Sequence, residues 1–252
     1  MRIKNSPIFL SILFTLLALI FPTIAGAIIT VKKISNLSAI FLIQFIATAG
    51  GVLVTLWIMK KSKFSFKDFG FRKFKAETWM VVIVIFELVA FFNGITDHEG
   101  FSAQYVLILL LFVIAVGLCE EFIFRGLIFK YLSAKGLKTA IIGSSILFGV
   151  GHLANLATGA DLLMTILQIT FAFLFGLVCA EIVAKTKSIV FPIVWHAMHD
   201  FIAFLTDSEP NVLAVSIYVF HCIVLIGLAI YFWKALFPKK AVMDLKNPES
   251  YV

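Results

Sequence analysis

The stretch Ala103–Tyr131 reads AQYVLILLLFVIAVGLCEEFIFRGLIFKY and combines a long apolar run with a pair of acidic residues. A helix needs about 20 apolar residues to cross about 30 Å of hydrocarbon, so this run can span a bilayer. It is longer than a span requires, and we therefore expect it to tilt or to project into the interface. Ionisable groups are costly at membrane depth, which makes Glu120, Glu121 and Arg125 candidates for function.

The composition of the whole chain points the same way. Hydrophobic residues make up 62% of the 252 residues, charged residues 14%, and the mean hydropathy is +1.06. A soluble domain carries about 25% charged residues. We expect an all-α polytopic membrane protein, a bundle of about eight transmembrane helices forming a single membrane domain over residues 1–252. The apolar runs are Pro7–Val31, Leu37–Met59, Trp79–Ile95, Ala103–Tyr131, Thr139–Asn155, Leu162–Ala184, Ile189–Leu205 and Val212–Phe237.

The basic residues set the expected orientation. The net charge is +7, but most lysines and arginines lie in alternate short loops, for example between Lys60 and Lys75. This distribution is typical of membrane topology and argues against a nucleic-acid partner. By the positive-inside rule both termini are cytoplasmic, with an uncleaved first helix, although Lys32 and Lys33 break the alternation. Frequent lysine, isoleucine and phenylalanine are compatible with a bacterial plasma membrane.

Polar residues are concentrated in the fourth, fifth and seventh runs. Glu121 and Arg125 are spaced i, i+4 on one helix face, which predicts an ion pair. Glu120 points about 100° away and is left free for chemistry. His152 and Glu120 lie equally far along the chain from Gly136, where the two helices are expected to turn. Both should lie about 24 Å from that turn in straight antiparallel helices, and so at one level.

The seventh run carries His196, His199 and Asp200, of which His196 and Asp200 share a helix face. This spacing suits either one metal ligand with its orienting carboxylate or two ligands. His196 meets the other two helices only if the turn near Lys187 lies deep in the bundle. Two carboxylates, several imidazoles and one guanidinium are components of a hydrolytic centre, whereas a structural ion-pair network or an ion pathway is the alternative interpretation.

These residues form three ordered motifs. Glu120–Arg125 reads EExxxR, Phe148–His152 reads FxxxH, and His196–Asp200 reads HxxxD, close to HxxxN. The ordered set, from Ala103 to Leu205, resembles the CPBP family of intramembrane proteases, which comprises CAAX prenyl endopeptidases and bacteriocin-processing or immunity (Abi) homologues. The resemblance implies the catalytic set Glu120, Glu121, Arg125, His152, His196 and Asp200.

The resemblance implies that Glu120 and His152 activate water, that His196 and Asp200 complete the site, and that Glu121 and Arg125 hold the motif. The family mechanism can be drawn with or without a metal. Asp200 stands where an asparagine is expected, and an ionised carboxylate cannot donate a hydrogen bond to an oxyanion. This favours the version in which a divalent metal, taken as zinc, is bound. Its ligands would be Glu120, His152, His196 and Asp200.

We therefore expect an intramembrane metallo-endopeptidase of the CAAX type, whose partners are the lipid bilayer and a membrane-associated peptide or protein substrate. The substrate could be a prenylated protein, a leader peptide or a pheromone. A catalytically weak family member acting in bacteriocin immunity or membrane sensing is the alternative, and a small transporter is a third. Isolated polar residues receive a structural interpretation, with Glu181 paired to Lys185. The others in this group are Glu87, Gln168 and His221.

Overall fold

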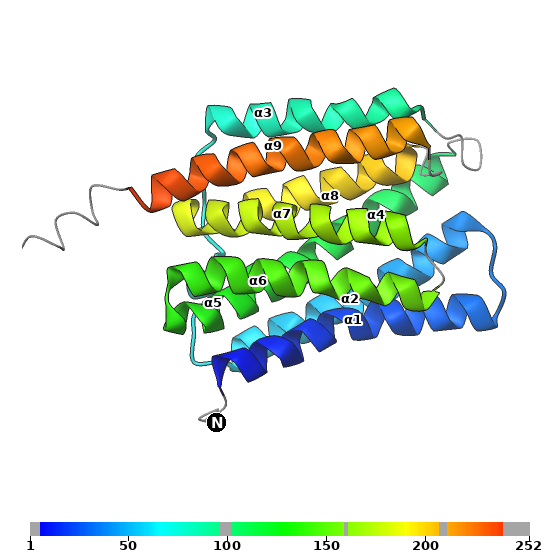
Figure 1. Cartoon of the computed structure of the whole chain (residues 1–252). Coiled ribbons are helices and arrows are strands. Elements are labelled where there is room, and N and C mark those ends of the chain that lie inside the picture. The colour runs from blue at the N-terminus through cyan, green and yellow to red at the C-terminus, as the bar shows by residue number, and fades with distance from the viewer. Residues whose placement is uncertain (1–5, 96–101, 159–160, 207–210, 239–252) are drawn as a thin grey trace, which may run out of the picture.

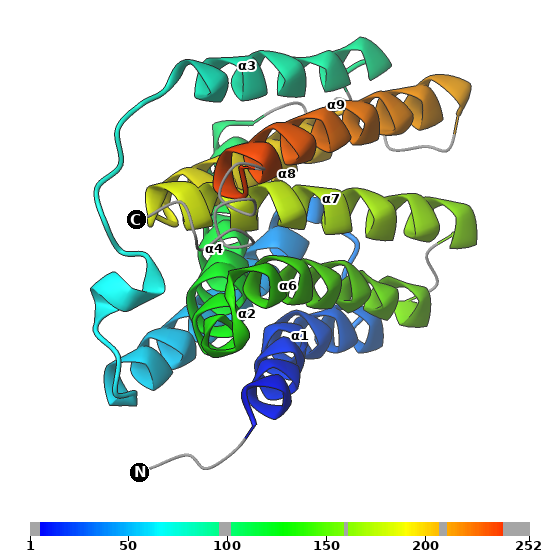
Figure 2. The same ribbon diagram turned by 60° about the vertical axis from the view of Figure 1, so that its left-hand side comes forward.

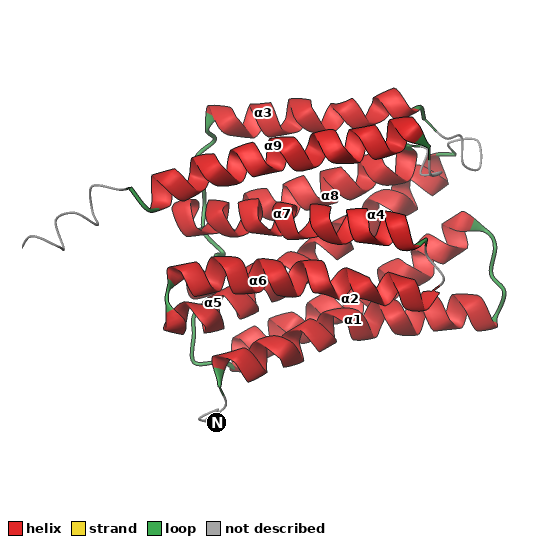
Figure 3. Cartoon of the chain, in the orientation of Figure 1, coloured by secondary structure: helices red, strands yellow, loops and turns green. Residues whose placement is uncertain are grey.

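The computed structural model describes residues 6–95, 102–158, 161–206 and 211–238. These residues form helices joined by loops, with no β-strand among them (Figure 3). The expected all-α fold is confirmed, because each apolar run forms a helical segment. The helices are α1 (Pro7–Val31), α2 (Leu37–Lys61), α3 (Thr78–Glu87), α4 (Ala103–Glu121), α5 (Phe129–Leu132), α6 (Leu137–Gly151), α7 (Leu162–Thr186), α8 (Val190–Leu205) and α9 (Val212–Leu236).

Six helical segments of the described chain are long and apolar enough to cross a membrane. Two apolar helices are shorter: α3 with its 3₁₀ extension to Asn93, and α8 with 16 residues. Large apolar side chains face outward, as Leu53 and Trp57 do on α2 at 68% and 60% exposure. Water would disfavour such a surface, whereas lipid tails accommodate it, so the exterior fits a bilayer.

The fourth apolar run forms one continuous but irregular helical segment. After Glu121, α4 passes into a π-helix, Phe122–Ile128, then into α5 and a short 3₁₀ turn. The segment ends at Gly136, whose φ of +110° favours glycine and allows the sharp reversal into α6. The turn was predicted at this glycine, whereas the π-helix was not predicted.

The bundle packs α8 against α4. Figures 1 and 2 show α1 and α2 along one edge, α3 and α9 along the other, and α4 crossing between them. Helix α8 packs on α4 and contacts α3 and α7. Gly117 permits the close approach, since a Cβ atom there would lie 3.0 Å from the Ile193 carbonyl oxygen of α8. Both carboxylates of α4 are thereby brought next to α8.

The turn between α7 and α8 lies below the surface of the protein. The segment between α2 and α3 crosses this end of the bundle (Figure 1) and binds the turn. The Ser188 hydroxyl donates to the Arg72 carbonyl at 2.6 Å, and the Ile189 amide donates to the Gly70 carbonyl at 3.0 Å. Both Ser188 and Ile189 are buried. Because α8 starts this deep, its sixth and later residues reach the level of the α4 carboxylates.

Candidate active site

The base of the site is a dry ion pair on the α4 segment. Arg125 Nη1 lies 3.2 Å from Glu121 Oε1, and neither side chain is exposed. The guanidinium also lies over the Phe148 ring of α6, with 4.3 Å between Cζ and the ring centroid. The predicted i, i+4 ion pair is confirmed. The Arg125 nitrogens make no hydrogen bond to a described residue, so the ion pair and the Phe148 ring are the contacts that hold the guanidinium.

His196 joins α8 to this ion pair. Its Nδ1 lies 3.0 Å from Glu121 Oε1, the same oxygen that faces Arg125. An ionised carboxylate can only accept, so Nδ1 carries the proton and the carboxylate sets the orientation of the ring. The sequence predicted only Arg125 as a partner of Glu121. It did not predict the contact with His196, because nothing local to either motif links residues 75 positions apart.

The other face of His196 looks toward two carboxylates. Nε2 lies 3.7 Å from Asp200 Oδ2 and 4.0 Å from Glu120 Oε2. These separations are too long for direct hydrogen bonds. The side chains of Asp200 and Glu120 are 21% and 29% exposed, whereas Glu121 and Arg125 are not exposed at all. The site therefore has a dry inner layer and an accessible outer layer.

His152 completes the group from the end of α6. Its Nδ1 donates to the Phe148 carbonyl at 3.0 Å, which leaves Nε2 as the acceptor nitrogen. The Phe148 ring lies between the two imidazoles, at centroid distances of 5.2 Å from His152 and 5.8 Å from His196. His152 is also close enough to Glu120 for an electrostatic interaction. Phe148 thus contacts three of the six predicted site residues, and the other three, all carboxylates, lie around His196.

Residues 102–202, which carry all six side chains, match the family profile described as type II CAAX prenyl endopeptidase Rce1-like. The match covers residues 102–202 of the 252, and over this segment the chain is similar to that family. No curated protein matches the chain. The resemblance seen in the three motifs is confirmed, and together with the six long apolar helices it identifies an integral membrane protein.

Zinc binding would require a fixed separation between the ligand atoms of the four predicted metal ligands. A tetrahedral site with bonds of about 2.1 Å holds its ligand atoms about 3.4 Å apart. The separations from His196 Nε2, 3.7 and 4.0 Å, are wider. Across the described residues, no group of three His, Cys, Asp or Glu side chains is arranged to hold a metal ion. Metal binding by these four residues stays a prediction.

A second polar cluster lies beside the first and consists of Glu87, Trp195, His199 and His221. Glu87 is fully buried and accepts from Trp195 Nε1 at 2.7 Å and from His199 Nδ1 at 2.9 Å. His221 Nε2 lies 3.9 Å from the same carboxylate. Glu87 and His221, for which the sequence offered no motif partner, both belong to this buried cluster. Each sits alone in an apolar run, so only the packing of α3, α8 and α9 reveals the cluster.

The expected pairing of Glu181 with Lys185 was wrong. Lys185 forms its ion pair with Glu77, just before α3. The carboxylate oxygens of Glu181 are buried, and no described residue hydrogen-bonds to them. The long lysine side chain reaches the polar end of the bundle, as expected for a snorkelling residue, and leaves the buried carboxylate behind.

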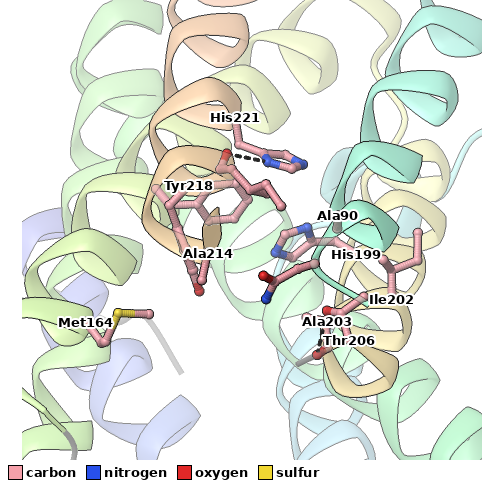
Figure 4. Close-up of a pocket in the computed structure, with 12 residues that line it drawn as sticks. Ala90, Met164, His199, Ile202, Ala203, Thr206, Ala214, Tyr218 and His221 are labelled. Atoms are coloured by element: carbon pink, nitrogen blue, oxygen red, sulfur yellow. Dashed lines mark hydrogen bonds between the residues drawn. The ribbon is translucent and has the colours of Figure 1, made fainter. Parts of the chain in front are cut away.

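A cavity of about 130 Å³ opens next to the second cluster. Figure 4 shows His199 of α8 with Tyr218 and His221 of α9 around it, and Met164 of α7 at its edge. The lining is mostly apolar side chains with these few polar groups. None of the six predicted site residues lines the cavity.

Proposed function

We propose that this Rce1-like chain is an endopeptidase that hydrolyses a peptide bond of a membrane-associated protein or peptide. The observation that carries the proposal is the two-layer site. A buried Glu121–Arg125 pair fixes His196 from below, and Glu120, His152 and Asp200 form an accessible polar rim. Hydrolysis needs a base beside a water molecule and a donor beside the carbonyl oxygen, and the rim together with His196 supplies both kinds of group.

Glu120 and His152 activate the attacking water in this proposal. The Glu120 carboxylate accepts the proton, and Nε2 of His152, free because Nδ1 is bonded to the Phe148 carbonyl, holds the water by a second hydrogen bond. The oxygen of the water attacks the peptide carbon while its proton moves to Glu120. The same proton then passes to the leaving amine, so one water is consumed and two chain ends are released.

His196 stabilises the negative oxygen that forms during attack. When Nε2 is protonated, the ring donates from Nδ1 to Glu121 and from Nε2 to the oxyanion. Asp200 cannot donate to that oxygen while it is ionised. Its place, 3.7 Å from His196 Nε2, suits it to orient the imidazolium instead. A bound divalent metal, if present, would supply Lewis acidity at this rim.

The test uses purified protein in detergent and a degenerate library of quenched fluorescent peptides, half of them with a farnesylated cysteine near the C-terminus. Wild-type protein should release fluorescence. Glu120→Ala and His152→Ala should each lower the rate by about 100-fold or more, the usual size of general-base effects. Glu181→Ala is the matched control, because it also removes a carboxylate from the bundle. Undiminished cleavage by both rim variants would refute the proposal.

A second candidate function is peptide binding without cleavage, as in an immunity or sensor protein. Asp200 favours it, since an aspartate in place of an amide donor weakens oxyanion stabilisation. Under this alternative, cells producing the Glu120→Ala protein resist an external peptide toxin as well as wild-type cells do. Under the endopeptidase proposal that resistance, where present, is lost with the glutamate.

The orientation of the chain is also proposed and not yet measured. Basic residues gather at the end of the bundle that carries Lys60, Lys135 and Lys187. The positive-inside rule then places this end, and both termini, in the cytoplasm of a bacterial cell. Cysteine-accessibility labelling at Lys135→Cys in intact cells tests this, since labelling from outside would reverse the orientation.

A further inference from the structure

We propose that Glu87 of α3 is a positioning residue for His196 and Asp200. This inference rests on the proposed function, because it assigns Glu87 the task of holding the reactive face of α8. Glu87 lies outside residues 102–202, the segment that matches the family profile. It does not reach the polar rim, and it acts on the rim through its two hydrogen-bonded partners on α8.

One carboxylate grips α8 at two points. Trp195 Nε1 donates to Glu87 Oε1 at 2.7 Å, and His199 Nδ1 donates to Oε2 at 2.9 Å. Residues 195 and 199 are spaced i, i+4, so they lie on one face of the helix, a turn apart. Trp195 directly precedes His196, and His199 directly precedes Asp200. These two hydrogen bonds therefore fix the rotation of α8 about its axis and its position along that axis at the turn that carries His196 and Asp200.

A second buried carboxylate holds the same turn from another side. Glu121 of α4 accepts from His196 at 3.0 Å. Helix α8 is thus held between Glu87 and Glu121, both of which are fully buried. Two fixed acceptors on different helices define the orientation of a short helix better than one, because a rotation that lengthens one bond is resisted by the other. Together they aim His196 Nε2 at the rim.

The two donors have little freedom to follow a displaced partner. The His199 ring stacks on Phe171 of α7 with 4.5 Å between centroids and 19° between planes. The Trp195 ring packs on Phe175, also at 4.5 Å. Because both rings are wedged against α7, loss of the Glu87 contacts would be relieved by movement of α8 itself. The rim residues would move with it.

Two imidazoles face the Glu87 carboxylate. His199 Nδ1 of α8 donates a hydrogen bond to it at 2.9 Å, whereas His221 Nε2 of α9 lies 3.9 Å away and makes no hydrogen bond. An ionised carboxylate accepts from both Trp195 and His199, whereas the amide of a glutamine presents its own N–H groups to one of them. Glu87→Gln is therefore nearly isosteric yet breaks the grip, which makes it the decisive substitution.

The kinetic test compares Glu87→Gln with Glu181→Gln, which replaces a buried carboxylate that no described residue hydrogen-bonds. We expect kcat of Glu87→Gln to fall about 10-fold to 100-fold with KM within about 3-fold, since small misplacements of reacting groups cost about that much. Glu181→Gln should keep the wild-type kcat. A purely structural role would lower the folded fraction and leave kcat per folded molecule unchanged, and that result would overturn the inference.

A double-mutant cycle shows whether the grip acts as one unit. Trp195→Phe replaces the buried indole by a smaller ring without the N–H and leaves the Glu87 charge and the His199 bond, so it serves if Glu87→Gln does not fold. We expect the double variant to lose about as much kcat as Glu87→Gln alone, because contacting residues are not additive. Wild-type kcat in Trp195→Phe, or full additivity in the cycle, would contradict the inference.

A spectroscopic measurement tests the inference even if no peptide is cleaved. The side-chain ¹⁵N signals of His196, assigned with His196→Gln in protein labelled at histidine, report the bond to Glu121. They should shift in Glu87→Gln and stay in place in Glu181→Gln. Unshifted His196 signals in Glu87→Gln would overturn the positioning role. Absence of cleavage by wild-type protein would instead refute the proposed function, so the two failures are distinguishable.

Discussion

Replacing Gly117 with alanine should move α8 away from Glu120 and Glu121, the carboxylates of α4. The new Cβ atom would lie 3.0 Å from the Ile193 carbonyl oxygen and 3.3 Å from the Ala197 amide nitrogen. Both are backbone atoms of α8 and cannot rotate away. An ordinary contact begins at 3.4 Å, so α8 must retreat by about 0.4 Å next to His196.

The magnitude follows from two opposing terms. Overpacking costs about 1–3 kcal/mol, and the better helix propensity of alanine returns about 1 kcal/mol. The net loss of stability is therefore about 0–2 kcal/mol. A displacement of about 1 Å can cost 100-fold in rate, so a retreat of about 0.4 Å should cost about 5-fold to 10-fold in kcat. Activity should suffer more than stability does.

The assay is peptide cleavage per folded molecule, with thermal unfolding in the same detergent. Gly227→Ala on α9 is the matched control, because nothing lies within 4 Å of its added Cβ atom. The control should unfold at the wild-type temperature or slightly above it and keep full activity. If Gly117→Ala cleaves peptides as fast as Gly227→Ala does, the close approach of α4 and α8 does not set the geometry of the site.

Three further predictions concern charge and metal. Glu121→Gln leaves Arg125 buried without its counter-charge and should lose about 3–5 kcal/mol of stability, so an unchanged melting temperature would contradict the buried pair. The hydrogen bond from Lys185 holds the pKa of the Glu77 carboxyl below its ordinary 4.5. Its contribution to stability is complete above pH 4.5 and is lost as the pH falls through the lowered pKa, so acid should lower the melting temperature of wild-type protein more than that of Glu77→Gln. If the polar rim binds zinc, elemental analysis should find one equivalent in wild-type protein and none in His196→Ala, whereas metal-free protein that still cleaves would show that the side chains suffice.

Much of the fold and site follows from the sequence because the relevant patterns are local. Apolar runs define the helices, and the spacing of Glu121 and Arg125 defines their ion pair. The equal distances from Gly136 placed Glu120 and His152 correctly near each other, since the turn lies where the glycine is. Such features depend on only one or two consecutive helices.

The remaining features depend on contacts between distant parts of the chain. The depth of His196 is set by the segment before α3, which binds Ser188 and Ile189 and buries the start of α8. The bond from His196 to Glu121 and the grip of Glu87 on α8 join separate helices. An apolar run gives no sign of which neighbour its single carboxylate faces, so these contacts could not be read from the sequence.

The π-helix at Phe122–Ile128 divides one long helical span into two parts whose side chains are rotated differently about the helix axis. In a regular α-helix each residue advances by about 100°, so the facing of Glu121 would dictate that of every later side chain. The wider π turn resets this relation just after the acidic pair. The half before it can aim carboxylates at α8 while the half after it fits α1 and α6. Within this one helical segment, the direction in which the α4 carboxylates point is thereby independent of how the later half packs on α1 and α6.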